Sequence, residues 1–452
     1  MNTLLHKLLL LLVVLAPLPL GSNREWSWTL CAFIAAVIAL AWAVQSLLRP
    51  QQVSISLKPP IIILFLAVCL WAWLQTVAWV PAGWKHPLWG LNAEVLGQYM
   101  NGSISLAAQD SFTALMRLLC YGLVFFLAFQ FGRDRDKALI TFKWLAFFGL
   151  LYAIYGLAMF WGGYGTLFWF VDEWFKQDVR GTFVNRNSYA TYAGLVLLCA
   201  IAVFNQHITR QSIAPYQVPG GGEDRVERFI LQVWKPLIAI LLMTTALILT
   251  HSRGGFFSTL AGGMVLMYLL NKRQQSQSKK SKAALAGAVL VAVMAFVLTS
   301  EVLMQRIDRI TVDGNARLEV YGMTADAIDD NPLLGFGYGT FSDSFRLYRD
   351  ERLSTHFHKT HNTYLENIFE LGWPAAAILF FTITWLMLIC WRGAHSRRRD
   401  WVYPSTGVAA TVLVGIHSFF DFSLQMPGVA ITYACILGVA VAQSYSSISK
   451  QP

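Results

Sequence analysis

Several arginines and histidines stand in segments between long apolar runs, where they could bind a charged ligand and exchange protons. Arg180, Arg253 and Arg317 lie in three such segments, and His358 and His361 follow in the last of them. A guanidinium group is planar and can bind two phosphate oxygens at once, and an imidazole exchanges protons near neutral pH. We therefore expect a site for a polyanionic ligand.

Arg253 is the arginine whose surroundings most favour a functional role. It lies in the sequence His-Ser-Arg-Gly-Gly at residues 251–255, a turn too short to carry the guanidinium group away from the spans that it joins. The two glycines let backbone or ligand approach closely. An arginine near the end of a span otherwise extends to the lipid headgroups, which is the alternative for Arg306, Arg309 and Arg346.

Membrane-spanning helices must position these residues. Of the 452 residues, 56% are hydrophobic and 13% are charged, whereas a soluble chain carries about 25% charged residues. The apolar runs could cross about 30 Å of hydrocarbon as helices, which excludes a soluble protein and predicts an all-α polytopic membrane protein. We expect about twelve transmembrane helices, near residues 7–20, 27–48, 61–80, 113–131, 138–160, 188–205, 233–250, 255–270, 283–300, 373–391, 402–420 and 428–446. The first is expected to be retained rather than cleaved as a signal peptide, because Pro17 and Pro19 follow the apolar run at 8–14 and there is no clean small-x-small cleavage site.

The net charge of +10 is concentrated in alternate loops. These loops contain Arg49 and Lys58; Arg133, Arg135 and Lys137; Arg210, Arg225 and Arg228; Lys272, Arg273, Lys279, Lys280 and Lys282; and Arg392, Arg397, Arg398 and Arg399. By the positive-inside rule they are cytoplasmic, and both termini fall on that side. This pattern indicates the lipid bilayer as a partner and argues against nucleic acid. The candidate residues then lie on the opposite face.

The longest segment on that opposite face, residues 301–372, should contain helices of its own, because a structureless loop of this length is uncommon. Asp313, Gly314 and Asn315 are expected to cap a helix over residues 316–329. A second helix is expected near residues 341–349, and a third should begin near His361.

Four short motifs follow one another on this face. They are Arg-Gly-Thr-Phe-Val-Asn-Arg-Asn at 180–187, His-Ser-Arg-Gly-Gly at 251–255, Asn-Pro-Leu-Leu-Gly-Phe-Gly at 331–337, and His361-Asn362 followed after nine residues by Gly372. In this order they resemble the O-antigen ligase/polymerase superfamily of bacterial envelope glycosyltransferases. That superfamily includes the O-antigen ligase WaaL, Wzy-type polymerases and bacterial protein O-oligosaccharyltransferases.

The resemblance covers roughly residues 175–440. It divides the chain into N-terminal transmembrane helices at 1–174 and an O-antigen ligase/polymerase-like region at 175–447, which includes a periplasmic catalytic loop at 301–372. Ala375 stands where the oligosaccharyltransferases usually have Gly, Thr or Tyr. This departure weakens the interpretation as a protein-glycosylating enzyme.

The resemblance implies a GT-C-like membrane protein of the bacterial inner membrane, with its active site in the periplasm. The donor would be a glycan on a polyprenyl (undecaprenyl) diphosphate carrier, and the acceptor a hydroxyl of lipid A core or of a growing glycan. Such an enzyme uses no nucleotide sugar, no metal and no cofactor. One direct displacement at the anomeric carbon would invert its configuration.

The resemblance also assigns roles to individual residues. His361 would be the catalytic base, with His358 as a rival. Arg253, Arg317 and Arg180 would bind the diphosphate and stabilise the leaving group. The supporting residues would be Asn362, Glu366, Asn185 and Ser252, and Glu366 would either orient the substrate or fix the loop. We expect His361 in the first turn of a helix, where the helix dipole would keep its ring neutral.

Other functions and partners stay open. His417 and Asp421, near the outer end of a late span, could form a packed pair or support the site. A transporter of bicarbonate or another anion is the main alternative function, and a non-catalytic scaffold of a polysaccharide assembly machine is another. Within the enzyme class, the sequence does not separate a ligase from a polymerase.

Overall fold

The computed structural model describes residues 2–48, 59–167, 170–171, 176–212, 222–273, 307–353 and 356–445. Apart from a hairpin of two-residue strands, β1 (Thr166–Leu167) and β2 (Phe170–Val171), the regular elements in these ranges are helices. The prediction of an all-α polytopic membrane protein is confirmed.

Seven helices are long and apolar enough to cross a membrane, and four apolar helices are shorter. The seven are α2 (Glu25–Leu48), α5 (Ala108–Gly132), α6 (Arg135–Trp161), α7 (Arg186–Ser212), α9 (Arg253–Arg273), α14 (Thr363–Ser396) and α16 (Pro427–Ser444). The shorter ones are α1 (Asn2–Leu15), α3 (Pro59–Leu74), the apolar part of α8 (Gly222–Ile248) and α15 (Val402–His417). These correspond to eleven of the twelve predicted helices; the predicted helix at 283–300 lies outside the described residues.

Helix α16 forms the centre of the bundle. Every residue from Pro427 to Gln443 is buried, as expected for a helix that is hydrophobic on all sides. It packs against α5, α14 and α15, and α6 packs against α7. Helices from both 1–174 and 175–447 therefore share one core.

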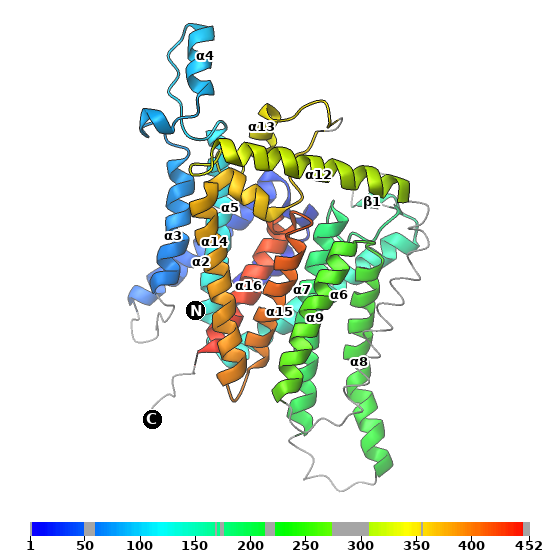
Figure 1. Ribbon diagram of the computed structural model, residues 1–452. Coiled ribbons are helices and arrows are strands. Elements are labelled where there is room, and N and C mark those ends of the chain that lie inside the picture. The colour runs from blue at the N-terminus through cyan, green and yellow to red at the C-terminus, as the bar shows by residue number, and fades with distance from the viewer. Residues whose placement is uncertain are drawn as a thin grey trace.

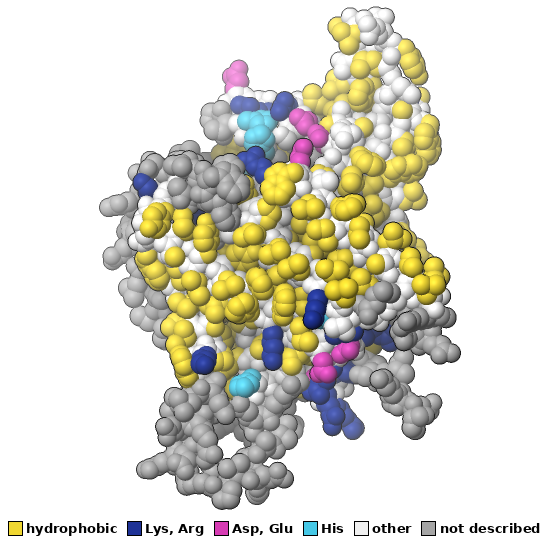
Figure 2. Space-filling model, turned by 180° about the vertical axis from the view of Figure 1, so that it is seen from behind, with side chains coloured by type: hydrophobic (Ala, Val, Ile, Leu, Met, Phe, Trp, Pro, Cys, Tyr) yellow, Lys and Arg dark blue, Asp and Glu magenta, His cyan; other side chains and the backbone are white. Residues whose placement is uncertain are grey.

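Lys- and Arg-rich loops lie together at one end of the bundle. Arg135 Nε lies 2.8 Å from Asp400 Oδ1, which joins the loop before α6 to the loop before α15. Lys272 Nζ, at the end of α9, lies 3.4 Å from His395 Nε2, at the end of α14. Figure 2 shows a broad hydrophobic band between two rims that carry the charged side chains. This arrangement fits the alternation of basic loops in the sequence.

The other end of the bundle carries helices that do not span it. Helix α12 (Ile307–Asp330) lies across the tops of the spanning helices, and α13 (Phe341–Ser344) and α4 (Leu88–Leu96) lie at the same end (Figure 1). Three-residue 3₁₀ helices occur at η1 (Leu20–Ser22), η3 (Ala82–Trp84), η5 (Phe345–Leu347) and η6 (Ser423–Gln425). The predicted large helical loop on this face is confirmed.

The predicted start of its first helix is wrong. Helix α12 begins at Ile307 and continues through Asp313, Gly314 and Asn315, which were expected to cap it. A glycine costs a helix only about 1 kcal/mol relative to alanine. Such a local penalty does not stop a helix that continues on both sides of it.

Helix α14 contains a sharp break at Gly372, and the motif at 331–337 packs onto this break. Gly372 and Gly335 have positive φ angles of 75° and 68°, and a Cβ on either would lie within 2.5 Å of the other segment's backbone. The amide of Phe336 donates to the Phe369 carbonyl at 3.0 Å, and that of Trp373 donates to the Pro332 carbonyl at 2.8 Å. The motif therefore ties the end of α12 to the outer half of α14.

Gln75, just after α3, completes this junction. Its side chain is fully buried. Nε2 donates to the carbonyl oxygens of Leu334 and Glu370, both at 2.8 Å, and Oε1 accepts from the Tyr338 amide at 3.0 Å. One amide group from the N-terminal part of the chain thus joins the two segments that precede and follow the His361 loop.

Candidate functional site

His361 lies at the outer end of the bundle, and its ring is held by an aspartate from a distant segment. His361 Nδ1 is 3.2 Å from Asp421 Oδ1. Burial alone would raise the pKa of the Asp421 carboxyl group. The hydrogen bond from His361 and the nearby imidazoles instead hold this pKa below its ordinary value, so the carboxylate is ionised. A carboxylate only accepts hydrogen bonds; Nδ1 is therefore the donor in this pair, and in the neutral ring Nε2 is the nitrogen that can accept a proton.

The expected placement of His361 in the first turn of a helix is wrong. Helix α14 begins at Thr363, and Asn362 is its N-cap, accepting from the amides of Tyr364 and Leu365 at 3.0 and 3.2 Å. His361 precedes this cap. The Asn362 side chain fixes the start of the helix at this point, because its oxygen accepts from two backbone amides that would otherwise have no partner. The Asp421 carboxylate, rather than the helix dipole, orients the His361 ring and determines which ring nitrogen donates a hydrogen bond.

The backbone of His361 adopts an uncommon conformation with a φ of 58°, which a residue with a side chain adopts only when its surroundings hold it there. The Tyr321 hydroxyl, on α12, donates to the His361 carbonyl oxygen at 3.1 Å. The ring also packs edge-on against Phe422, with centroids 4.8 Å apart. Contacts from two other segments therefore fix both the main chain and the ring.

Glu366 fixes the loop in front of His361. Its carboxylate is fully buried and accepts from Lys359 Nζ at 2.9 Å and from the Thr360 amide and hydroxyl, both at 3.0 Å. Of the two roles considered for Glu366, these contacts match the fixing of the loop.

The turn that follows α15 brings the other candidate segments to His361. A Cβ on Gly254 would lie 3.5 Å from the His417 ring and 3.6 Å from Phe420 Cβ, so the start of α9 lies against this turn. Arg317 Nη1, from α12, is 3.5 Å from the Phe420 carbonyl oxygen. Asp421, the next residue, holds His361. Segments around positions 254, 317 and 361 therefore meet at residues 417–421.

Arg253 and Arg317 both keep hydrogen-bond donors available at this meeting point. Arg253 is the first residue of α9 and is exposed, and it makes no hydrogen bond or ion pair to the described part of the chain. The contact of Arg317 is at the outer limit of a hydrogen bond. The N-terminus of α9 adds free backbone amides and a favourable dipole for an anion. The arrangement can place a diphosphate beside an imidazole that accepts protons.

Comparison with known protein families matches residues 238–380 to the family model of O-antigen ligases. This stretch of the chain is similar to O-antigen ligases. The match includes α9, α12 and the His361 loop and ends within α14, a narrower stretch than the resemblance in the sequence. A search of curated proteins finds no match.

Arg180 lies in a partly buried ionic cluster beside the stretch that matches O-antigen ligases. Asp178 Oδ1 accepts from Arg186 Nη1 at 3.0 Å and from His251 Nδ1 at 2.9 Å, and Oδ2 is 3.3 Å from Arg180 Nη2. Burial alone would raise the pKa of the Asp178 carboxyl group, but the hydrogen bond from His251 and the two arginines hold it below its ordinary value. The cluster ties the turn before Arg253 to the segment that carries Arg180.

Replacing Asp178 with asparagine should destabilise the protein by about 3 kcal/mol, because it leaves partly buried cations without their counter-charge. A thermal unfolding scan of the detergent-purified protein should show a melting temperature several degrees lower. Because folding lowers the pKa of Asp178, its stabilisation is present above the ordinary carboxyl pKa and is lost as the pH falls through the lowered value. The difference between wild type and variant should therefore shrink in acid. An equal difference at all pH values would contradict the assigned cluster.

Asn185 and Ser252 act within their own turns. Asn185 Oδ1 accepts from the Asn187 amide at 2.7 Å, just before α7, and Ser252 Oγ accepts from the Gly255 amide at 3.2 Å, at the start of α9. Side chains of this kind satisfy backbone donors that the first helical turn leaves free. Ser252 therefore shapes the turn that presents Arg253.

His358, the alternative candidate for the base, lies apart from Asp421. Its Nδ1 is 3.2 Å from the Ser342 hydroxyl, and its ring packs edge-on against His356 with centroids 4.6 Å apart. In the described part of the chain His358 is not paired with a carboxylate. Its geometry therefore favours a hydrogen-bonding role over that of a base.

Sequence reasoning missed two residues, Tyr321 and Asp178, and left the role of a third open. The sequence left open whether Asp421 pairs with His417 or supports the site. In the structure His417 Nδ1 instead lies 3.1 Å from the Thr191 hydroxyl and 3.2 Å from the Ser423 hydroxyl. Tyr321 carried no motif, and Asp178 lay outside the motifs. The one available signal was an aspartate at the outer end of an apolar span, which is costly in a membrane and therefore needs a partner.

Proposed function

We propose that the protein is an inverting, metal-independent membrane glycosyltransferase. It transfers a glycan from a polyprenyl (undecaprenyl) diphosphate carrier to a sugar hydroxyl, as an O-antigen ligase or an O-antigen or exopolysaccharide polymerase. The observation that carries this proposal is the pair formed by His361 and Asp421 at the turn where the Arg253 and Arg317 segments meet. The family match to O-antigen ligases supports it.

The residues divide the chemistry between the two substrates. His361 Nε2 accepts the proton of the acceptor hydroxyl as its oxygen attacks the anomeric carbon, and Asp421 stabilises the imidazolium that forms. The bond from the anomeric carbon to the diphosphate oxygen breaks on the opposite side. Arg253 and Arg317 bind the negative charge that develops on this oxygen. The diphosphate leaves on its lipid, and the configuration of the sugar is inverted.

The face at which this occurs is opposite the basic loops. We place it in the periplasm of a bacterial cell, with the protein in the inner membrane and both termini in the cytoplasm. A diphosphate anchored in lipid stays near the bilayer surface, and the turn at 417–421 lies at the end of a membrane-spanning bundle. The donor diphosphate and His361 can therefore lie at the same depth relative to the bilayer surface.

The test is a reconstitution of purified protein with an undecaprenyl-diphosphate-linked repeat unit, with and without a lipid A core acceptor. Products are separated by size. A single addition to the core establishes a ligase, and a ladder formed without the core establishes a polymerase. If folded protein forms neither product, the proposal fails; anion flux in sealed vesicles would then support a transporter.

Replacing Asp421 with asparagine should lower the turnover rate about tenfold to a hundredfold, the equivalent of about 1.5–3 kcal/mol for a hydrogen bond to a charged group. The asparagine oxygen can still accept from Nδ1, but it carries no charge to stabilise the imidazolium. The rate is measured at saturating donor and acceptor, and unfolding scans verify that the variant is folded. A folded variant with the wild-type rate would remove Asp421 from the mechanism.

A further inference from the structure

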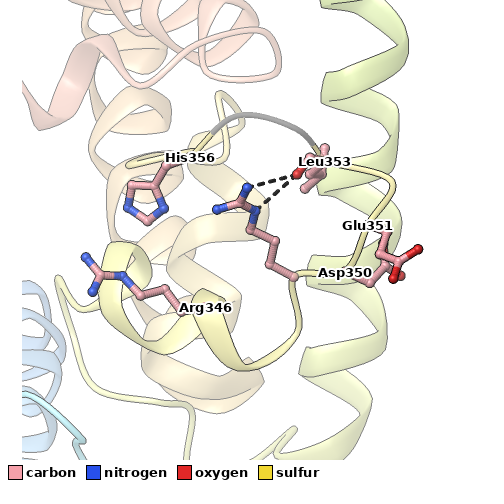
Figure 3. A pocket seen from close by; sticks show the side chains of 6 residues that line it. Arg346, Asp350, Glu351, Leu353 and His356 are labelled. Atoms are coloured by element: carbon pink, nitrogen blue, oxygen red, sulfur yellow. Dashed lines mark hydrogen bonds between the residues drawn. The ribbon is translucent and has the colours of Figure 1, made fainter.

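A surface hollow of about 740 Å³ opens on the outer face, beside the candidate site rather than within it (Figure 3). It lies between η5 and the loop that leads toward His361. Its lining residues are Arg346, Arg349, Asp350, Glu351, Leu353 and His356. These residues come from two neighbouring stretches of the same loop, so the hollow is built by the loop that presents the base.

The cationic side chains of the hollow are positioned to bind a ligand. Figure 3 shows Arg346 and His356 on the same side of the hollow, with Glu351 extending away from them. Arg349 is held in place, because its Nε and Nη2 donate to the Leu353 carbonyl at 3.2 and 2.9 Å.

Two of the acidic side chains nearby, Asp350 and Asp343, are already engaged with arginines. Asp350 Oδ2 lies 2.7 Å from Arg352 Nη2, and Asp343 Oδ1 lies 3.5 Å from Arg346 Nη2. Arg352 also reaches Glu319 on α12 at 3.3 Å. With these carboxylates paired, Arg349 and part of Arg346 remain to attract an anion.

The histidines beside the hollow add hydrogen-bonding groups. Ser342 Oγ lies 3.4 Å from His356 Nε2 and 3.2 Å from His358 Nδ1. Partial desolvation, the neighbouring His358 and the guanidinium groups of Arg346 and Arg349 together lower the pKa of His356. Two imidazoles and a hydroxyl next to two arginines suit a ligand that carries both hydroxyl groups and negative charge.

The hollow is joined to the candidate base by a short stretch of chain. His356 lines the hollow, and the ring of the next residue, Phe357, packs edge-on toward the His361 ring with centroids 6.4 Å apart. A ligand in the hollow therefore lies next to the segment that holds His361. The donor diphosphate is already provided for by Arg253 and Arg317, so an anion here would belong to a second substrate.

We propose that this hollow binds the acceptor glycan through an anionic substituent, a phosphate or carboxylate carried on a sugar. The assignment of this ligand as the acceptor rests on the proposed glycosyltransferase function. The arginines hold the anionic group, and Ser342, His356 and His358 bind neighbouring hydroxyl groups. The acceptor then enters along the loop toward His361. Because Arg346 and His356 are exposed, binding is weak and depends on salt.

Binding is tested without donor and without turnover, so that its outcome is independent of transfer activity. Glucose 6-phosphate and glucose are titrated into the purified full-length protein, and the histidine ring resonances are followed by NMR. We expect the phosphorylated sugar to bind and glucose not to bind. Replacing Arg346 with glutamine should weaken binding about tenfold, the loss of one charge-assisted hydrogen bond. A bound anion should also raise the pKa of His356, since it opposes the nearby arginines.

The matched control is Lys85→Gln, which removes an exposed positive charge elsewhere on the same face. Equal weakening in this variant, or wild-type binding in both Arg346→Gln and His356→Gln, would overturn the proposal. A lipid headgroup could supply the same anionic group, and this alternative is tested in nanodiscs. If phosphatidylglycerol abolishes binding of the sugar phosphate and phosphatidylcholine does not, the hollow holds a lipid headgroup, and the acceptor assignment is wrong.

Discussion

Replacing His361 with alanine should lower the rate of glycan transfer by about 10²–10⁴-fold, the contribution typical of a general base. The structure gives this residue an ionised partner at Nδ1 and a main chain held by Tyr321. Alanine removes the proton acceptor and leaves the arginines in place. The measurement is the turnover rate with a lipid-diphosphate-linked glycan and saturating acceptor, with binding of the donor followed separately.

The matched control for this prediction is His358→Ala. His358 is exposed, its Nδ1 lies 3.2 Å from the Ser342 hydroxyl, and its ring packs against His356. As a proposed acceptor-binding residue it should affect acceptor affinity, but its removal should change the turnover rate at saturating acceptor far less. If His358→Ala abolished transfer and His361→Ala did not, the assignment of the base would be reversed. Rescue of His361→Ala by added imidazole would support the assigned role, because it restores a base without restoring a contact.

Replacing Arg253 with alanine should slow the transfer step by about 10²–10³-fold, since removal of one preorganised donor costs about 3–4 kcal/mol. Arg253 stands at the N-terminus of α9, next to the turn that holds Asp421. The effect should fall on the turnover rate more than on donor binding, because the leaving oxygen gains charge only as its bond breaks. Single-turnover kinetics with bound donor separates the two.

Arg253→Lys tests whether the planar fork matters or only the charge. Lysine keeps the positive charge but cannot bind two oxygens in one plane. We expect an intermediate rate. Because Arg253 is exposed, neither variant should lower the melting temperature. A wild-type rate in folded Arg253→Ala would exclude this residue from the stabilisation of the leaving group.

The membrane architecture could be predicted because it depends on local properties of the sequence. Apolar runs of a fixed length specify spans, and the placement of lysine and arginine specifies which loops share an end. Arg135 and Asp400 meet at that end although they are 265 residues apart. Helix α12 was found but misplaced at its start, since cap-like residues such as Asp313 occur inside helices as well as before them.

The pairing of side chains in the site could not be predicted in the same way. His361 and Asp421 are 60 residues apart, and no periodicity relates them. The sequence placed His361 by its position before a helical stripe. The helix begins two residues later than expected, at Thr363, so His361 lies before the helix and against a carboxylate rather than in its first turn. The Asp178 cluster likewise depends on two segments, 178–186 and the turn at His251, that meet only in the folded chain.

The junction at the α14 break limits how the chain can be divided. The region that matches O-antigen ligases, residues 238–380, relies on residues outside it for hydrogen bonds to its backbone carbonyls at this junction. Gln75 Nε2 donates to the carbonyls of Leu334 and Glu370, and Trp71 Nε1 donates to the Leu371 carbonyl at 2.8 Å. A buried carbonyl that loses its donor costs about 1–3 kcal/mol. Chimaeras that combine this region with the first helices of a relative should therefore assemble only when Trp71 of α3 and Gln75 just after it are kept with it. The matched region cannot be transferred by itself, and its inheritance is linked to that of a helix far earlier in the chain.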